Sequence, residues 1–293
     1  MNPFPHVAVL ATETTEIFSP GLSGAILDGT GGAGDHIALI TARSSEQLTA
    51  VVFDRDPEAL AHLKVRLASL GDRLILVHAN FADFPEILAE HGIEKLSGAI
   101  LDLGISSNHL RPDRGFSYRE EGPLDMRMDF SQGDTARELI QRASAEELTH
   151  ILEMYGEVRH GEGLARAMKQ TVRGGGLQTT TDLVDLIRLE SPSVGAKFMS
   201  RVFQSLRIAV NGELQNLERF LDAIPAYLAP GGRLAIISFH SLEDRLVKHT
   251  FKGWAREGIV RLGTKKPIVP TYEEVCANKR SRSARLRWVE KEG

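Results

Sequence analysis

The sequence predicts an α/β protein in which a parallel sheet is interrupted by an inserted helical domain. In the first third of the chain, short apolar runs alternate with segments of helical periodicity, as in βαβ units. The fourth run ends at Gly104 and the fifth begins at Arg233, 129 positions later. A crossover between neighbouring parallel strands needs only one helix and short loops, so this gap predicts an insertion.

Five apolar runs are expected to form the strands of this sheet. They occupy residues 25–30, 48–56, 74–81, 98–104 and 233–241. Each run is nearly continuous in apolar residues, which is typical of strands buried on both faces of a parallel sheet. Between the second and third runs, residues 57–70 place Leu60, Leu63 and Leu67 on one stripe and are expected to be helical.

The insertion itself is expected to be mainly helical. Capping boxes at 144–147 and 179–182 each precede an apolar segment of helical period. A long amphipathic pattern over 198–221 is expected to return the chain to the sheet.

The C-terminal part is expected to complete the sheet. A helix over 243–255 precedes two short runs, and the second of them, 283–290, alternates Leu286 and Trp288 with arginines. This period of two predicts an antiparallel pair of strands. The expected domains are therefore a sheet domain of residues 1–107 and 212–293 and an inserted helical domain of residues 108–211.

The composition is that of an ordinary globular protein. Of the 293 residues, 42% are hydrophobic and 25% are charged. No run of eighteen apolar residues occurs, and the chain opens without the regions of a signal peptide. The single cysteine, Cys276, excludes an intramolecular disulfide and a cysteine-rich zinc site. We expect a cytoplasmic protein with no membrane segment and no metal.

Positive charge is concentrated near the C-terminus. The formal net charge is -4 at pH 7, yet residues 279–287 contain five cations and no acid. Such a run favours a patch that binds a polyanion, and a solvated strand edge kept soluble by arginine is the alternative.

A glycine-rich turn follows the first expected strand. The pattern D-x-T-x-G-x-G runs from Asp28 through Gly32 to Gly34, where a nucleotide-type ligand can meet backbone N–H groups. Asp54 follows Gly34 by twenty residues, the spacing at which a carboxylate reaches ribose hydroxyls. The turn also contains G-x-G-x-x-G, which suits a dinucleotide. Asp28, directly before the glycines, favours the cationic methyl donor S-adenosylmethionine instead.

Asp102 ends the fourth expected strand at the same edge of the sheet. An exocyclic amine is a poor base, so a site that methylates it needs acceptors that hold its N–H groups and align its lone pair. Asp102 or nearby backbone carbonyls are expected to do this, whereas Ser106 and Ser107 are expected to be turn-forming hydroxyls.

Longer motifs identify the family that the chain resembles. They are RGFSY (114–118), GPLDMRMD (122–129), YGE (155–157), FQSLRI (203–208), ISFHSLEDR (237–245) and RSARLR (282–287). Over essentially the whole chain, and in this order, they resemble the bacterial 16S ribosomal RNA cytosine N4-methyltransferase family known as RsmH or MraW. The resemblance implies a Rossmann-like class I methyltransferase sheet with an inserted helical substrate-recognition domain, and S-adenosylmethionine as the cofactor.

The resemblance also implies which residues contact the cofactor. Together with Gly32 of the glycine turn, they are Gly34, Asp35, His36, Asp54, Phe81, Asp102 and His109. The family has glycine where this chain has Asp35 and glutamine where it has His109. Imidazole titrates near neutral pH. If His109 contacts the cofactor, we therefore expect the cofactor affinity to depend on pH.

Substrate contacts are expected where aromatic and arginine side chains can hold an unstacked base. The expected residues are Arg114, Phe116, Tyr118 and Arg127 in the loop after the fourth strand, His240, and Arg280 and Arg282 in the basic run. For His240 the structural alternative is a helix cap formed by Ser241 with Asp244.

The resemblance implies methyl transfer to N4 of a cytosine in 16S ribosomal RNA, near the decoding site of the small subunit, with no DNA partner. A nicotinamide-dependent Rossmann dehydrogenase and a catalytically weak ribosome-assembly factor of the same fold remain open. A zinc deaminase acting on the same amine is excluded, because its metal site needs two or three cysteines.

Overall fold

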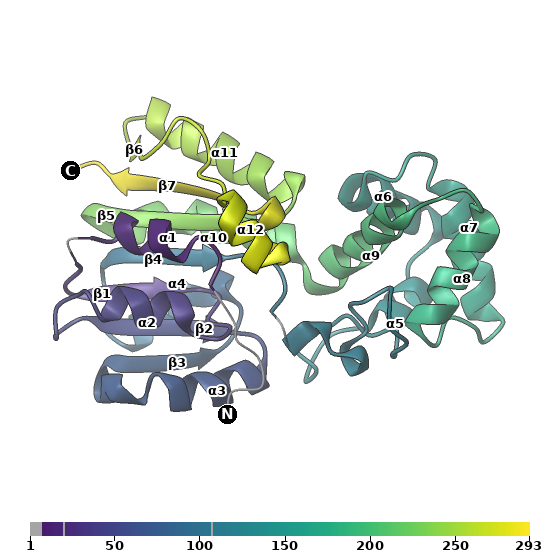
Figure 1. Cartoon of the computed structure of the whole chain (residues 1–293), viewed down its shortest axis with the longest axis horizontal. Coiled ribbons are helices and arrows are strands. Elements are labelled where there is room, and N and C mark those ends of the chain that lie inside the picture. Colours follow the sequence, from purple (N-terminus) through teal and green to yellow (C-terminus); the bar gives the residue numbers. More distant parts are fainter. Residues whose placement is uncertain (1–7, 20, 107) are drawn as a thin grey trace. The chain divides into compact units, whose positions relative to one another are not determined.

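The structure, a computed structural model, describes residues 8–19, 21–106 and 108–293 (Figure 1). Its contacts divide the chain into two compact units. The first, here named the sheet unit, comprises the chain up to Gly104 and from Leu214 onward. The second, named the helical insert, comprises Ile105–Glu213. Each unit has a hydrophobic core of its own.

The sheet unit is built on seven strands in the order β3-β2-β1-β4-β5-β7-β6. β1 to β5 are parallel, and β7 pairs antiparallel with both β5 and β6. The strands are β1 Ala25–Asp28, β2 Thr49–Asp54, β3 Leu74–His78, β4 Leu96–Asp102, β5 Leu228–Ser238, β6 Val260–Leu262 and β7 Arg285–Lys291. The predicted fold class and the predicted antiparallel pair are confirmed.

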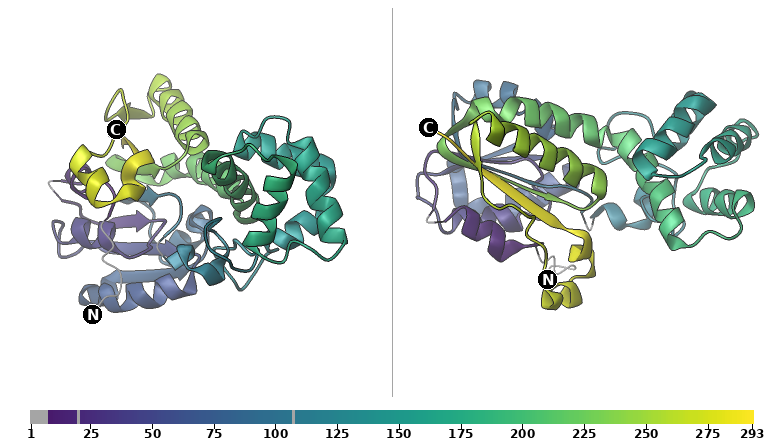
Figure 2. Two further views of the ribbon diagram at one scale, coloured as in Figure 1. Left: turned by 45° about the vertical axis from the view of Figure 1, so that its right-hand side comes forward. Right: turned by 90° about the horizontal axis from the view of Figure 1, so that it is seen from above.

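Helices cover both faces of the sheet (Figure 2). Alternate residues of β2 pack on opposite sides, with Val51 and Phe53 in one core and Ala50 and Val52 in the other. The first side is covered by α4 Phe84–Glu90, α10 Glu213–Tyr227 and α11 Ser241–Arg256, and the second by α1 Ala11–Ile17, α2 Asp35–Thr41 and α3 Pro57–Arg66. Burial on both faces explains why the strands are almost entirely apolar.

The carboxyl ends of β1, β2 and β4 meet at one edge of the sheet, because the three strands are parallel neighbours. The register pairs Asp28 with Val52 of β2 and with Ile100 of β4. From β1 the sheet grows toward β2 and β3 on one side and toward β4 and β5 on the other. Ligands of open α/β sheets bind where the strand order reverses in this way. The fold therefore points to the strand ends at Asp28, Asp54 and Asp102.

Charge pairs hold β7 against α11. Asp244 accepts hydrogen bonds from Arg285 at 2.9 Å and from Arg287 at 2.7 Å. Burial raises the pKa of Asp244, but the two guanidinium groups outweigh it and leave the pKa below its usual value. Two cations of the basic run are therefore committed to holding the fold together.

The helical insert packs its helices around a separate apolar core. Its α-helices within the described residues are α5 Ala136–Arg142, α6 Ala145–Gly156, α7 Glu162–Arg173, α8 Thr180–Glu190 and α9 Ala196–Asn211. The predicted capping boxes are confirmed, with Ser144 and Glu147 at the start of α6 and Thr179 and Asp182 at the start of α8. Each box satisfies backbone N–H groups that have no partner within the helix.

The amphipathic pattern over 198–221 forms two helices. α9 ends at Asn211, and Gly212 adopts a φ of 61° before α10 begins. Glycine takes this left-handed conformation without a Cβ penalty, which is why it ends helices. The apolar periodicity continues across the break, so hydrophobicity alone did not mark it.

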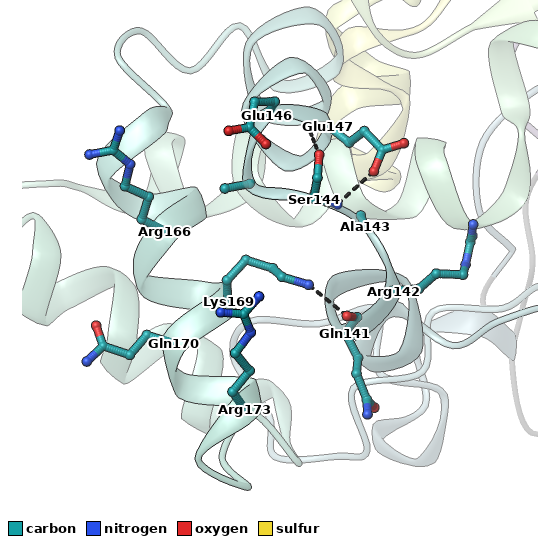
Figure 3. A pocket seen from close by; sticks show the side chains of 11 residues that line it. Gln141, Arg142, Ala143, Ser144, Glu146, Glu147, Arg166, Lys169, Gln170 and Arg173 are labelled. Carbon is teal, nitrogen blue, oxygen red and sulfur yellow. Dashed lines mark hydrogen bonds between the residues drawn. The ribbon is translucent and has the colours of Figure 1, made fainter.

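A buried lysine joins α7 to α5. Lys169 is 9% exposed, and its ammonium donates to the backbone carbonyls of Ile140 at 3.1 Å and Gln141 at 2.7 Å (Figure 3). Both carbonyls lie in the last turn of α5, where the helix has no further N–H groups to offer and its dipole is negative. One cation therefore satisfies two backbone acceptors at the end of α5.

We expect Lys169→Met to lower the free energy of unfolding by about 1–3 kcal/mol, because two backbone carbonyls at the end of α5 lose a charged donor. Urea denaturation followed by far-ultraviolet circular dichroism measures the change. Lys197→Met, at an exposed position on α9, is the matched control and should change little. Equal stability of the two variants would show that Lys169 does not hold α5.

Candidate functional site

Hydrogen bonds tie the glycine loop after β1 to the ends of two neighbouring strands. The N–H of Gly32 donates to Asp54 Oδ2 at 2.7 Å, and the N–H of Gly31 donates to the carbonyl of Phe53 at 2.8 Å. On the other side, the N–H of Asp102 donates to Thr30 Oγ1 at 2.6 Å. The loop is thus fastened to β2 and to β4.

The loop needs its glycines because it lies directly against packed side chains. A Cβ on Gly29 would stand 2.3 Å from Leu101 Cδ2, and one on Gly31 would stand 2.7 Å from Leu63 Cδ1. Gly34, the residue before α2, has a φ of 79°, which favours glycine. Such a loop lets a ligand approach the backbone closely.

Asp54 holds this loop, and its surroundings raise its pKa. Besides Gly32, it accepts the N–H of Asp56 at 2.8 Å. Burial raises the pKa of Asp54 to about 6, although the hydrogen bonds from Asp56 and Gly32 oppose the rise. A partly buried carboxylate at a strand end is suited to accept hydrogen bonds from a ligand's hydroxyl groups.

A buried acid, Asp28, lies at the end of β1. It is 3% exposed and accepts the N–H of Thr30 at 3.0 Å. Burial raises its pKa to about 7, and the neighbouring acids Asp102 and Asp54 add to the rise while Thr30 and His36 oppose it. Placing a cation nearby would favour the ionised form.

His36 and Asp102 face one another at this edge. His36, on α2, is 8% exposed, and its Nε2 lies 3.5 Å from Asp102 Oδ2. Burial lowers the pKa of His36, but Asp102 and the other nearby acids outweigh it, so the net pKa is raised. Among the described residues, neither ring nitrogen of His36 has a hydrogen-bond partner, and Asp102 Oδ1 has none either. Buried polar atoms normally bond to protein, to water or to a ligand, so these atoms are available to a bound group.

Phe81 and Asp35, also expected to contact the cofactor, have defined partners. Phe81 follows β3, lies beside Gly29 and makes an edge-to-face contact with Phe220 at 5.6 Å. Asp35 forms an ion pair with Arg66 of α3. The Asp35 carboxylate is thereby engaged with a neighbouring helix, which leaves its backbone as the part suited to a cofactor contact.

These residues fit S-adenosylmethionine better than a dinucleotide. The edge brings together three carboxyl groups, Asp28, Asp54 and Asp102, beside a loop that permits close approach. A sulfonium cation is favoured by nearby carboxylates, and ribose hydroxyls find an acceptor in Asp54. A pyrophosphate would bring like charges to the same edge.

His109 belongs to the helical insert. It is 6% exposed, its Nδ1 accepts the N–H of Ser106 at 3.1 Å, and its ring lies 5.1 Å from that of Phe116. The bond to Ser106 places the ring proton on Nε2. Ser107 lies outside the described residues.

Two residues of the loop after β4 that are expected to contact substrate are buried in the structure. Arg114 is fully buried, and its Nη2 donates to the carbonyls of Arg127 at 3.3 Å and Met128 at 2.8 Å. Phe116 is 7% exposed, with its ring against His109. Both side chains therefore pack within the insert and help to fix the conformation of this loop.

Tyr118 and Arg127 are more accessible but also have partners. Tyr118 packs edge-to-face on Phe203 at 5.9 Å. Arg127 Nε and Nη2 each donate to the carboxylate of Asp125 at 2.8 Å.

Phe130 is an exposed aromatic residue that was not among the residues expected to contact substrate. It is 38% exposed, and its ring centroid lies 3.8 Å from the guanidinium carbon of Arg114. In the sequence, the feature that could have drawn attention to Phe130 is its position directly after the GPLDMRMD motif.

His240, expected to contact substrate, forms the helix cap of α11 in the sheet unit. Its Nδ1 accepts the N–H of Glu243 at 3.4 Å, and Glu243 Oε2 accepts the N–H of His240 at 3.3 Å. The expectation that Ser241 caps with Asp244 was therefore wrong by one residue. Asp244 is instead paired with Arg285 and Arg287.

Arg280 and Arg282 lie in a short 3-10 segment, Lys279–Ser283, and both are exposed. Asn278 begins the segment by accepting the N–H of Arg280 at 3.1 Å.

Among the helices of the described residues, none has both the length and the hydrophobicity that a membrane span requires.

A polar cavity lies among α5, α6 and α7 of the insert (Figure 3). Its cations are Arg142, Arg166, Lys169 and Arg173. Arg142 pairs with Asp134, Arg166 pairs with Glu162, and Lys169 donates to the end of α5. Because most of its charge is balanced by these partners, we assign the cavity no ligand.

The comparisons with known proteins agree over the full length of the chain. Residues 3–292 match the MraW methylase family. Ribosomal RNA small subunit methyltransferase H of Sorangium cellulosum is 45% identical over 292 residues, covering 98% of this chain and 91% of the relative. The protein of the same name from Geobacter sp. is 41% identical over 313 residues, covering 99% and 100%. The relative from Cyanothece sp. is 44% identical, covering 98% and 95%. The chain belongs to the MraW methylase family.

Proposed function

We propose that this chain transfers a methyl group from S-adenosylmethionine to N4 of a cytosine in 16S ribosomal RNA, near the decoding site of the small subunit. The observation that carries the proposal is the edge at which Asp28, Asp54 and Asp102 surround a close-packed glycine loop. The relatives are named as small-subunit ribosomal RNA methyltransferases, which supports the substrate class.

The cofactor would be held by the glycine loop and by the acids around it. When bound, S-adenosylmethionine supplies an electrophilic methyl group on a positively charged sulfur. Asp54 is suited to accept the ribose hydroxyls, and Gly32 and Gly34 let the loop backbone approach the ligand. The buried carboxylate of Asp28 adds negative charge that favours a cation.

Asp102 is the residue that we assign to the target amine. Its carboxylate, whose side chain is 21% exposed, is suited to accept an N–H of N4, which directs the nitrogen lone pair toward the methyl group. The nitrogen becomes acidic once it is methylated, so a strong base is not needed. Its proton can pass to Asp102, with His36 Nε2 3.5 Å away.

The helical insert is proposed to recognise the RNA, together with the exposed arginines of the sheet unit. A module of five helices is larger than a free nucleotide requires, within the residues that are described. Arg280 and Arg282 are exposed and suited to phosphate contacts, and Arg127 lies in the loop that follows β4.

The two alternative functions make different demands. A dehydrogenase would retain a nicotinamide dinucleotide, whose pyrophosphate the acidic edge disfavours. A catalytically weak assembly factor would bind the small subunit without methylating it, so turnover separates it from the proposed enzyme.

We expect Asp54→Asn to weaken S-adenosylmethionine binding about 10- to 100-fold, because loss of a partly buried charged acceptor costs about 1–3 kcal/mol. Isothermal titration calorimetry measures the affinity. Asp72→Asn, an exposed acid of the same unit, is the control and should leave it unchanged. Parental affinity in the Asp54 variant would remove Asp54 from the site.

Cofactor affinity is expected to fall when the pH is lowered from 8 to 5.5, by roughly tenfold, as carboxylates that attract the cation become protonated. The pKa of Asp28 is about 7 and that of Asp54 about 6, so both are ionised at the upper pH and largely neutral at the lower. Calorimetry across this range should show a smaller dependence for Asp28→Asn. His109→Gln tests the other source of pH dependence, and a flat parental profile would contradict both.

The reaction is tested on small subunits from a strain that lacks this methyltransferase. Incubation with protein and S-adenosylmethionine is expected to produce N4-methylcytidine, measured by nucleoside mass spectrometry. Asp102→Ala should reduce the methylation rate by more than tenfold, since removing one preorganised acceptor typically costs that much. No N4-methylcytidine with the parental protein, or methylation of DNA or protein instead, would contradict the proposal.

A further inference from the structure

The helical insert displays one aromatic side chain to solvent from a loop that is otherwise tightly bonded. Among the described residues, the exposed large hydrophobic side chains include two aromatic ones, Phe130 of the insert and Tyr272 of the sheet unit. The Arg114 guanidinium lies 3.8 Å from the centroid of the Phe130 ring and therefore occupies one side of it. Arg127 lies 6.0 Å from the same centroid.

Asn211 of α9 holds the loop before Phe130 by hydrogen bonds to its backbone. Asn211 Nδ2 donates to the carbonyl of Met126 at 2.8 Å, and its Oδ1 accepts the N–H of Met128 at 2.9 Å. Met126 is fully buried with a φ of 64°, a conformation that side chains other than glycine rarely adopt. Such strain persists only where surrounding contacts enforce it.

The loop after Phe130 is braced by a buried acid. Asp129 is 2% exposed, and its carboxylate accepts the N–H of Ser131 at 2.9 Å and the amide of Gln132 at 2.7 Å. Phe130 thus stands between two fixed backbone segments. Its ring orientation is set by the loop and by Arg114, and little conformational entropy is lost when a ligand covers it.

We propose that Phe130 is a stacking platform for an unpaired base of the RNA substrate. Single-stranded nucleic acids are held by aromatic side chains on which bases stack, often beside arginine. Here the ring is partly exposed and its orientation is fixed, and Arg127 lies on the same loop. This inference rests on the proposed function, because it takes the substrate to be RNA.

A structural explanation for Phe130 is that it merely shields the buried Arg114 from water. The two roles demand different properties of the side chain. A shield needs only apolar bulk, which leucine supplies. Stacking needs a flat ring, which tryptophan supplies and leucine does not.

The test measures binding of a short single-stranded RNA by four proteins: the parent, Phe130→Ala, Phe130→Leu and Phe130→Trp. Stacking is worth about 1–3 kcal/mol per base, so the alanine and leucine variants should bind about 5- to 150-fold more weakly. The tryptophan variant should bind as well as the parent, and its added fluorescence should be quenched by single-stranded RNA but not by a duplex. Leu189→Ala, at an exposed position on α8, is the control and should bind like the parent.

Parental affinity in Phe130→Leu, or in Phe130→Ala, would overturn the platform and leave the proposed function standing. If the parent itself binds no RNA, both fail. Thermal unfolding of each variant accompanies the titration, and restored binding in Phe130→Trp shows that a loss in the other variants comes from the missing ring. S-adenosylmethionine affinity should be the same in all of them.

Discussion

One hydrogen bond organises the candidate cofactor site: the N–H of Gly32 donates to Asp54. It fastens the loop after β1 to the end of β2, and the bond from Asp102 to Thr30 fastens the same loop to β4. The glycines then let the loop lie flat on Leu101 and Leu63, where a Cβ would collide. The closeness of Asp28, Asp54 and Asp102 is therefore a consequence of how this loop packs between parallel strand ends.

The same arrangement has an electrostatic cost that a cofactor can offset. Burial raises the pKa of Asp28 and of Asp54 toward neutrality, because ionised carboxyl groups are disfavoured away from water and near one another. A cation relieves both effects, whereas a pyrophosphate would add to the repulsion. This asymmetry distinguishes a methyl donor from a dinucleotide more clearly than the glycine pattern, which suits either.

In the helical insert, buried cations stabilise loops and helix ends by donating hydrogen bonds to backbone carbonyls. Arg114 donates to backbone carbonyls of the loop that carries Phe130, and Lys169 donates to the carbonyls that end α5. Each positive charge satisfies acceptors that the local backbone leaves without a partner. RGFSY and GPLDMRMD are consequently one structural unit, in which the first motif supports the second. An arginine in a motif that suggests substrate binding can thus have a structural role instead.

The sequence by itself determined the alternation of strands and helices, the insertion, the capping boxes and the family, because these depend on periodicity, spacing and long local motifs. It also placed Asp28, Asp54 and Asp102 at strand ends, and parallel pairing then brings them to one edge. Only the tertiary structure decided that Arg114 and Phe116 are buried, that Gly212 divides a continuous apolar pattern, that His240 caps α11 and that Phe130 is exposed. Exposure and capping depend on which distant backbone groups and side chains surround a residue, and local residue order does not specify those neighbours.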